Sequence, residues 1–212
     1  MTIPTTRIAM GVLFGALVAA VPARAGIQGT PHDMSGKGWG TTELCKFCHT
    51  PHQAQSVVGA PLWNHQSTTK SYTLYSSPTF DPNGGLTVTQ PGPQSKLCLS
   101  CHDGTVAIDS YANSGVIRAG THFMTSTNLV GGNGSLAADH PIAFIYNGAL
   151  AASDKHLNTP VSTRWVDAGQ TLPLYNGYME CATCHGVHDN TYTKFMRMSN
   201  AGSAMCMTCH TY

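Results

Sequence analysis

The stretch CATCHGVHDNTYTKFMRMSNAGSAMCMTCH, residues 181–210, contains one five-residue pattern twice. In each copy two cysteines stand two residues apart, and a histidine follows the second cysteine directly. The pattern occurs again as CKFCH at residues 45–49 and as CLSCH at residues 98–102. The copies use all eight cysteines of the chain. Because no cysteine is left over, one chemistry should account for all of them.

Three chemistries use paired cysteines. Disulfide frameworks are common in exported proteins, but they do not require a histidine after each second cysteine. Zinc sites built from CxxC pairs leave the following residue free. Covalent attachment of c-type haem requires that histidine, because the thiols bond to the two vinyl groups of the porphyrin and the next imidazole binds the iron. The repeated pattern therefore predicts four covalently bound haem c groups.

Each copy of the pattern is expected to supply two thioether bonds and one proximal iron ligand. The cysteines expected to hold haem are Cys45, Cys48, Cys98, Cys101, Cys181, Cys184, Cys206 and Cys209. The expected proximal ligands are His49, His102, His185 and His210.

The sixth ligand of each iron must come from elsewhere in the sequence. Histidine is frequent, at 11 of 212 residues, so candidates outnumber the vacant positions. Methionine is the other common distal ligand and raises the reduction potential. With histidine so plentiful, we expect bis-histidine iron throughout. Both axial positions are then filled, which favours electron transfer over enzymatic catalysis.

The composition fits an interior filled by cofactors. Charged residues make up 10% of the chain, against about 25% in an ordinary soluble domain. The 22 glycines and 12 prolines leave few aliphatic runs from which to build a protein core. There is also no basic cluster to neutralise phosphates, so we expect no nucleic-acid partner.

The first 25 residues have the features of a cleaved signal peptide. Arg7 precedes an apolar run at residues 8–21, and Ala23-Arg24-Ala25 forms a small-x-small cleavage site before Gly26. The apolar run is short for a bilayer span, and no later stretch is long and apolar enough to be one. We therefore expect an exported chain without a transmembrane segment after cleavage.

A weak internal repeat divides the remaining chain. CKFCHTPH (45–52) and CATCHGVH (181–188) both carry a second histidine three residues after the first, whereas the other two copies lack it. An isolated histidine, His32 or His140, precedes each extended copy. We predict a single domain over residues 26–212, made of two dihaem halves at about 26–120 and 121–212.

The expected fold is mostly irregular coil with short helices and few short strands, wrapped around a chain of four haems. Turn-forming residues dominate segments such as TQPGPQSK. Weak alternation predicts short strands within SYTLY (71–75) and HPIAFIY (140–146). Polar N-cap residues predict helices within TTELCKFCH (41–49) and SNAGSAMCMTCH (199–210).

Several segments together resemble those of a known family. They are CHTPH (48–52), PLWNH (61–65), CLSCHDGTVAID (98–109), HPI (140–142) and CATCHGVH…CMTCH (181–210). The chain is similar to multihaem cytochromes with doubled CxxCH motifs. More closely it resembles the tetrahaem outer-surface cytochromes of the OmcE type, which polymerise into extracellular cytochrome filaments, or nanowires. The resemblance covers most of the chain after the expected signal peptide.

The resemblance implies bis-histidine haems in a continuous chain and long-range electron transport to extracellular acceptors. It also implies that one distal histidine reaches a haem in a neighbouring copy, and His52 is the candidate. The histidines that match family positions are His52, His65, His140 and His188, with His32 next. His122 and His156 match none and are expected to be ordinary polar residues.

Two other functions remain open from the sequence. A monomeric periplasmic electron shuttle has the same motifs, and a multihaem reductase needs one haem with an open axial position. For a filament, the expected partners are copies of the chain itself, upstream periplasmic or outer-membrane cytochromes, and extracellular electron acceptors. The expected location is the cell surface or extracellular space, with the periplasm as the alternative.

Overall fold

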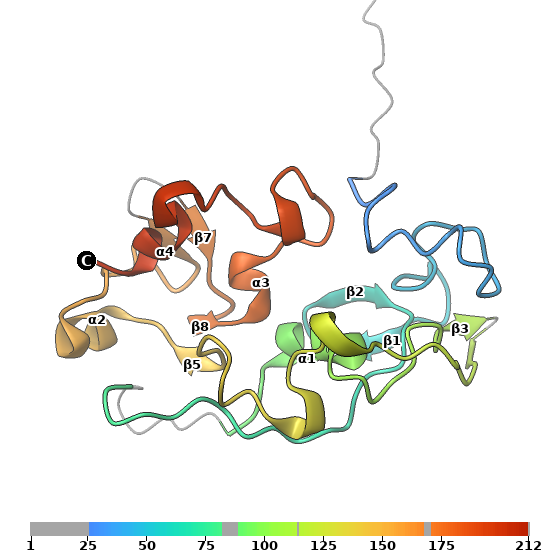
Figure 1. Ribbon diagram of the computed structural model, residues 1–212, viewed down its shortest axis with the longest axis horizontal. Helices are drawn as coiled ribbons and strands as arrows, with labels where there is room; N and C mark the ends of the chain where they lie inside the picture. The colour runs from blue at the N-terminus through green and yellow to red at the C-terminus, as the bar shows by residue number, and fades with distance from the viewer. Residues whose placement is uncertain (1–25, 82–88, 114, 168–170, 212) are drawn as a thin grey trace, which may run out of the picture.

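The fold is an irregular chain with short regular elements. The computed structural model describes residues 26–81, 89–113, 115–167 and 171–211 (Figure 1). Its α-helices are α1 (Pro93–His102), α2 (Gly148–Asp154), α3 (Cys181–Cys184) and α4 (Ala204–Cys209). Short 3₁₀ helices lie at Ser126–Asn128, Gly132–Gly134, Thr193–Phe195 and Ala201–Ser203. The expectation of a mostly irregular fold with few short elements is confirmed.

The strands pair locally and build no large sheet. Within the described residues they form four antiparallel pairs, each a separate two-stranded sheet. The pairs are β1 (Gln55–Val57) with β2 (Ala60–Trp63), β3 (Ala112–Asn113) with β4 (Val116–Ile117), β5 (Phe144–Ile145) with β8 (Tyr178–Met179), and β6 (Trp165–Asp167) with β7 (Thr171–Pro173). Isolated two-stranded sheets are marginal in water, so these pairs depend on what packs against them.

The elements of the two chain halves meet at the middle of the molecule. In Figure 1 the N-terminal segments, with β1, β2 and β3, lie on the right, and α2, β7 and α4 lie on the left. Helices α1 and α3 contact each other between them. Each of these two helices contains a CxxCH cysteine pair. The second and third motifs are therefore neighbours in space although 78 residues separate His102 from Cys181.

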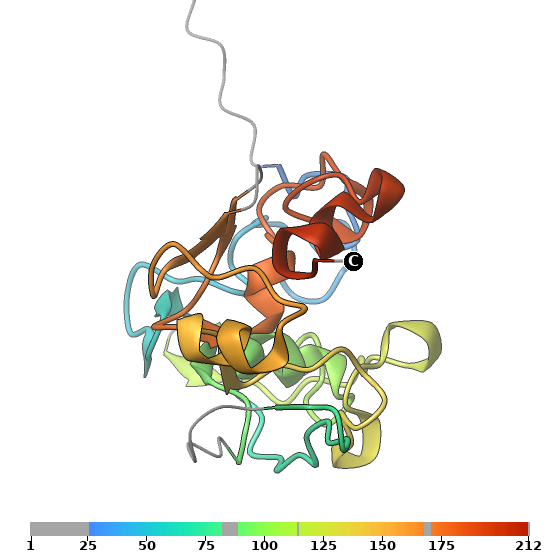
Figure 2. The same ribbon diagram turned by 90° about the vertical axis from the view of Figure 1, so that its left-hand side faces the viewer.

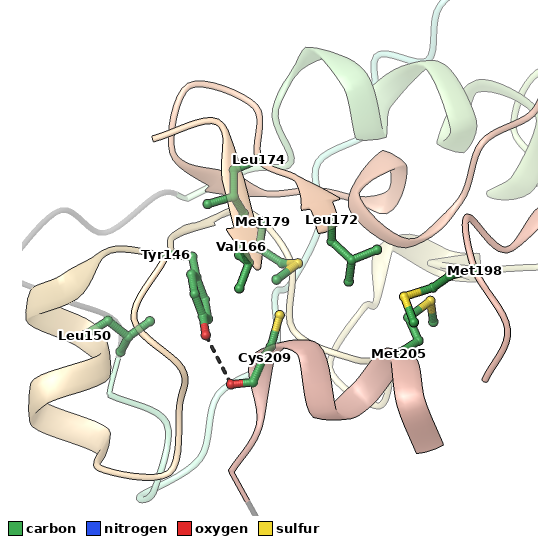
Figure 3. Packing of buried hydrophobic residues seen from close by; sticks show 9 residues of the cluster. All are labelled: Tyr146, Leu150, Val166, Leu172, Leu174, Met179, Met198, Met205 and Cys209. Atoms are coloured by element: carbon green, nitrogen blue, oxygen red, sulfur yellow. Dashed lines mark hydrogen bonds between the residues drawn. The ribbon is translucent and has the colours of Figure 1, made fainter. Parts of the chain in front are cut away.

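The apolar core is small and includes a motif cysteine. The larger cluster lies in the C-terminal half and comprises Tyr146, Leu150, Val166, Leu172, Leu174, Met179, Met198, Met205 and Cys209 (Figure 3). In it the Tyr146 hydroxyl donates to the Cys209 carbonyl at 3.2 Å. A second cluster contains Tyr72, Leu99 and Leu136. The protein side chains thus form two patches of core beside the motifs.

The expected elements at the C-terminal end are present. Residues 199–210 contain the 3₁₀ turn Ala201–Ser203 followed by α4, as predicted. In the 140–146 segment the strand is limited to β5. Figure 2 shows α4 in red, the last helix before the described end of the chain. The expected signal peptide, residues 1–25, lies outside the described residues, and no described helix is long and apolar enough to cross a membrane.

Three expectations for local structure are wrong. Residues 41–49 form turns rather than a helix, and His49 at their end pairs with Trp63 in an antiparallel bridge. Residues 71–75 form only one bridge, from Thr73 to Ser135. The segment before the second motif, expected to be a loop, instead starts α1, since Pro93 is favoured at the first position of a helix.

A buried carboxylate holds the end of α1. Asp103 follows the second motif, and its side chain accepts hydrogen bonds from the Tyr72 hydroxyl at 2.5 Å and the Thr68 hydroxyl at 2.8 Å. Burial raises the pKa of Asp103, but these hydrogen bonds outweigh it and the pKa is lowered. The Asp103 carboxylate is therefore ionised and tied to the 68–72 segment.

Substituting Tyr72→Phe should lower the free energy of unfolding by about 1.5–3 kcal/mol, because a buried carboxylate loses a charge-assisted donor. Denaturant unfolding of the haem-loaded protein measures this. The control is Tyr192→Phe at an exposed ring, for which a change within about 0.5 kcal/mol is expected. Equal stability of both variants would contradict the role of Tyr72.

Candidate functional site

Three of the four motif histidines are oriented by a hydrogen bond from Nδ1. The Nδ1 atoms of His49, His102 and His185 each lie 2.9 Å from a backbone carbonyl oxygen. The acceptors are the carbonyls of Pro61, Asn128 and Lys194, respectively. A histidine that donates from Nδ1 leaves Nε2 unprotonated for a metal, which is the usual second-shell arrangement of metal-binding imidazoles. These side chains are therefore set in the tautomer that iron requires.

Each of three motif histidines faces a second histidine ring in the described part of the chain. The ring centroids are 6.0 Å apart for His49 and His188. They are 6.1 Å apart for His32 and His102, and 6.4 Å apart for His140 and His210. Two imidazoles on opposite sides of one metal ion, with bonds of about 2 Å, place their ring centroids about 6.3 Å apart. The three pairs therefore fit bis-histidine iron.

The environment of two paired rings keeps them uncharged. Burial, followed by the nearby His102 and His188, lowers the pKa of His32 to about 4. His32 also stacks on Phe195, with ring centroids 4.4 Å apart. Burial, followed by the nearby His140, lowers the pKa of His210. Since iron binds neutral imidazole, these surroundings suit a ligand role.

The structure does not place His52, His65 and His185 in such pairs. His185 is exposed, and none of the ring contacts among the described residues involves it. His52 is also exposed. His65 is buried, with Nδ1 2.7 Å from the Gln66 carbonyl and Nε2 3.0 Å from the Ala107 carbonyl. Burial lowers the pKa of His65, so its neutral ring can donate to only one of these carbonyls, and Nε2 also lies 3.5 Å from the Cys101 sulfur.

The two histidines expected to be ordinary polar residues lie outside these pairs. His122 is exposed, stacks on Trp39, and has its Nδ1 3.1 Å from the buried Asp109 carboxylate. His156 is exposed, and its carbonyl accepts a hydrogen bond from Thr211 N–H at 3.0 Å. Neither ring faces a motif histidine in the described part of the chain.

The thiols of successive motifs lie near one another. Burial raises the pKa of the Cys101 thiol, and the nearby Cys48 thiol raises it further. A hydrogen bond with Cys181 is the first cause of the raised pKa of Cys98. The first motif therefore approaches the second, and the second contacts the third, through their cysteines.

The third and fourth motifs are linked in the same way. Burial raises the pKa of Cys184 to about 11, and Cys181 and Cys206 add to this effect. Burial raises the pKa of Cys209 to about 12, with Cys184 as the next cause. In each pair of successive motifs along the chain, a cysteine of one motif therefore affects the pKa of a cysteine of the other.

The cysteines do not form other common sites. All eight are free thiols, so none is paired as a disulfide. In the described part of the chain, no three His, Cys, Asp or Glu side chains converge to hold a bare metal ion. The arrangement instead offers two thiols and one imidazole at each motif, as covalent haem attachment needs.

Comparison with known proteins supports this reading. Residues 173–212 match the family described as "Doubled CXXCH motif". No curated protein matches the chain. The matched part contains the third and fourth motifs. The motifs and this match support a multihaem c-type cytochrome, a class of electron-transfer proteins that bind haem c covalently. Since haem c is attached outside the cytoplasm, they also indicate an exported chain.

The sequence motifs do not indicate one contact near the site. Gly26 forms a bridge with Asp189, beside His188. A Cβ atom at Gly26 would lie 2.3 Å from the His188 carbonyl oxygen, closer than real Cβ contacts allow. The start of the described chain is therefore packed against the loop that carries His188.

Substituting Gly26→Ala should push this loop away and lower the free energy of unfolding by about 1–3 kcal/mol, as overpacking does. The matched control is Gly36→Ala, because a Cβ there meets nothing within 4 Å. Denaturant unfolding of both haem-loaded variants provides the comparison. A Gly26→Ala protein as stable as Gly36→Ala would show that the loop yields freely.

Proposed function

We propose that the chain carries four bis-histidine haem c groups and conducts electrons along them, with copies joined end to end as an extracellular filament. The haems are numbered 1 to 4 after the motifs at 45–49, 98–102, 181–185 and 206–210. The physiological role of the filament is long-range electron transport from upstream periplasmic or outer-membrane cytochromes to extracellular acceptors.

The histidine pairs carry this proposal. We assign His188 as the distal ligand of haem 1, His32 of haem 2 and His140 of haem 4. Each assignment is supported by a ring separation of 6.0–6.4 Å to the proximal histidine. Of the five candidates, we assign His65 a structural role, because it is buried against backbone carbonyls and its ring contact is with Trp63 rather than with a motif histidine. Filled axial positions favour electron transfer over binding of a substrate.

The proximity of the thiols supports a single route. The pKa values of the motif cysteines depend on neighbouring cysteines that would hold haems 1 and 2, haems 2 and 3, and haems 3 and 4. Because the thioether bonds attach one edge of each porphyrin, neighbouring thiols bring neighbouring porphyrin edges together. An electron that enters at one end can therefore cross the molecule in short steps.

Haem 3 supports the proposal of a filament. Its proximal ligand His185 is exposed, and it has no histidine ring opposite it within the described residues. His52 is exposed and, in the described part of the chain, faces no motif histidine. In a filament, His52 of one copy would fill the open axial position of haem 3 in the next copy.

The same observation favours a second candidate function. If the chain acts alone, haem 3 keeps an open axial position, which a multihaem reductase needs. Haem 3 would then be high-spin and would bind small ligands. A monomeric shuttle in which another group fills this position is the remaining alternative.

Single substitutions of the distal histidines test the assignments. His188→Ala, His32→Ala and His140→Ala should each open one haem, so that the reduced protein binds about one additional CO per chain. His65→Ala is the matched control and should add none. Intact mass must first show the chain with four haems. If His65→Ala opens a haem and one of the other three does not, the assignment is wrong.

Substituting His52→Ala should abolish or shorten the filaments in electron micrographs of the secreted fraction. It should also leave haem 3 able to bind CO, because the neighbour no longer supplies a ligand. The control is His156→Ala, another exposed histidine, which should form filaments of wild-type length. Discrete particles of the wild-type protein under all conditions would refute the filament, and CO binding by them would favour the reductase.

A further inference from the structure

A buried glutamate lies where the two halves of the chain meet. Glu180 directly precedes Cys181 and is 3% exposed, whereas Glu43, the other glutamate, is exposed. Ser95, one turn before Cys98 on α1, is fully buried beside Glu180. The pair therefore lies between the attachment points of haem 2 and haem 3.

The hydrogen bonds of this pair join the two helices. The Ser95 hydroxyl donates to the Glu180 carboxylate and accepts from the Cys181 N–H at 2.9 Å. The carboxylate also accepts from the backbone N–H groups of Gly92 and Ser95, at the start of α1. One carboxylate thus satisfies free N–H groups of α1 while its own backbone begins α3.

The fit around the carboxylate is close. A Cβ atom at Gly92 would lie 2.2 Å from Glu180 Oε1. The backbone of Gly92 has φ −68° and ψ 173°, which any residue can adopt. Glycine is therefore needed at this position for space rather than for its backbone conformation. A methyl group at this position would displace the Glu180 carboxylate from the hydrogen bonds that join α3 to α1.

Helix capping alone does not explain this arrangement. Helix α2 is capped by Asn147, a short side chain that accepts from Leu150 N–H at 2.9 Å. No ion pair in the described part of the chain includes Glu180. Burial of the Glu180 carboxyl raises its pKa, although the hydrogen bonds from Ser95 and Gly92 lower it. Burying a carboxylate without a cation costs free energy. Capping alone would not require a buried carboxylate, because a short neutral side chain can cap a helix.

We propose that Glu180, Ser95 and Gly92 form a clasp that sets the separation and angle of haems 2 and 3. Glu180 is a positioning residue for electron transfer between the two dihaem halves. This inference rests on the proposed function, because it requires haems at both motifs. The inference adds to that function the protein contact on which electron transfer between haems 2 and 3 depends.

A double-mutant cycle in the haem-loaded protein tests the clasp. The variants are Gly92→Ala, Glu180→Ala and the two combined, each first shown by intact mass to carry four haems. The measurement is the Soret circular dichroism couplet, which depends on the distance and angle between neighbouring porphyrins. Gly92→Ala and Glu180→Ala should each reduce or reverse the couplet. In the Glu180→Ala background, Gly92→Ala should have no further effect, because its methyl group no longer meets the carboxylate.

Two controls separate the clasp from general damage. Gly148→Ala, at the start of α2 with ordinary contacts at 3.5 Å, should keep the wild-type couplet. Glu43→Ala, at an exposed glutamate near the first motif, should do the same. If Glu180→Ala does not accumulate with four haems, Glu180→Gln, which keeps the shape, takes its place and should shift the couplet.

Two results would overturn the inference. One is a wild-type couplet in both single variants with all four haems bound. The other is an equal effect of Gly92→Ala with and without the carboxylate. A wild-type chain that lacks haem 2 or haem 3 by mass would instead overturn the proposed function.

Discussion

The spacing between paired imidazoles is the constraint on which the rest of this structure depends. In the described chain, rings from distant segments lie 6.0–6.4 Å apart, as for His49 with His188. Such a gap has no stability of its own, because the rings do not touch. The paired strands are short, and the apolar clusters are small. Iron and porphyrin in these gaps would supply the cross-links and apolar surface that the side chains do not.

The junction of the halves has a different basis. There the second and third motifs meet through protein groups: the Cys98 and Cys181 thiols, and the buried Glu180 with its hydrogen bonds. The pair formed by His49 and His188 also joins the halves, from the first motif to the third. The halves suggested by the internal repeat are therefore interlocked. The proposed route for electrons would pass through the same contacts that hold the halves together.

The cysteines and the histidines that follow them are the clearest candidates in the sequence, because covalent haem attachment requires this spacing. Distal ligands are harder to predict from the sequence, because a distal histidine is defined by the haem iron that it faces in space and not by a motif. His65 belongs to a family-like segment, yet its ring lies against backbone carbonyls, whereas the His32 ring lies 6.1 Å from the ring of a motif histidine. The turn-forming residues around Pro93 predict a loop, but in the structure Pro93 begins α1. Glu180 belongs to no sequence motif, and its importance is indicated only by its burial in the structure.

The contact between Cys98 and Cys181 has a consequence for how the protein is made. An apoprotein that folded first would bring together thiols of two different motifs. Oxidation in the compartment outside the cytoplasm would join them as a disulfide, and each motif would lose an attachment point. The hydrogen bond with Cys181 and burial also raise the pKa of the Cys98 thiol, which makes it a poor nucleophile. Attachment to the extended chain avoids both outcomes, so maturation should load the cofactors before the halves close.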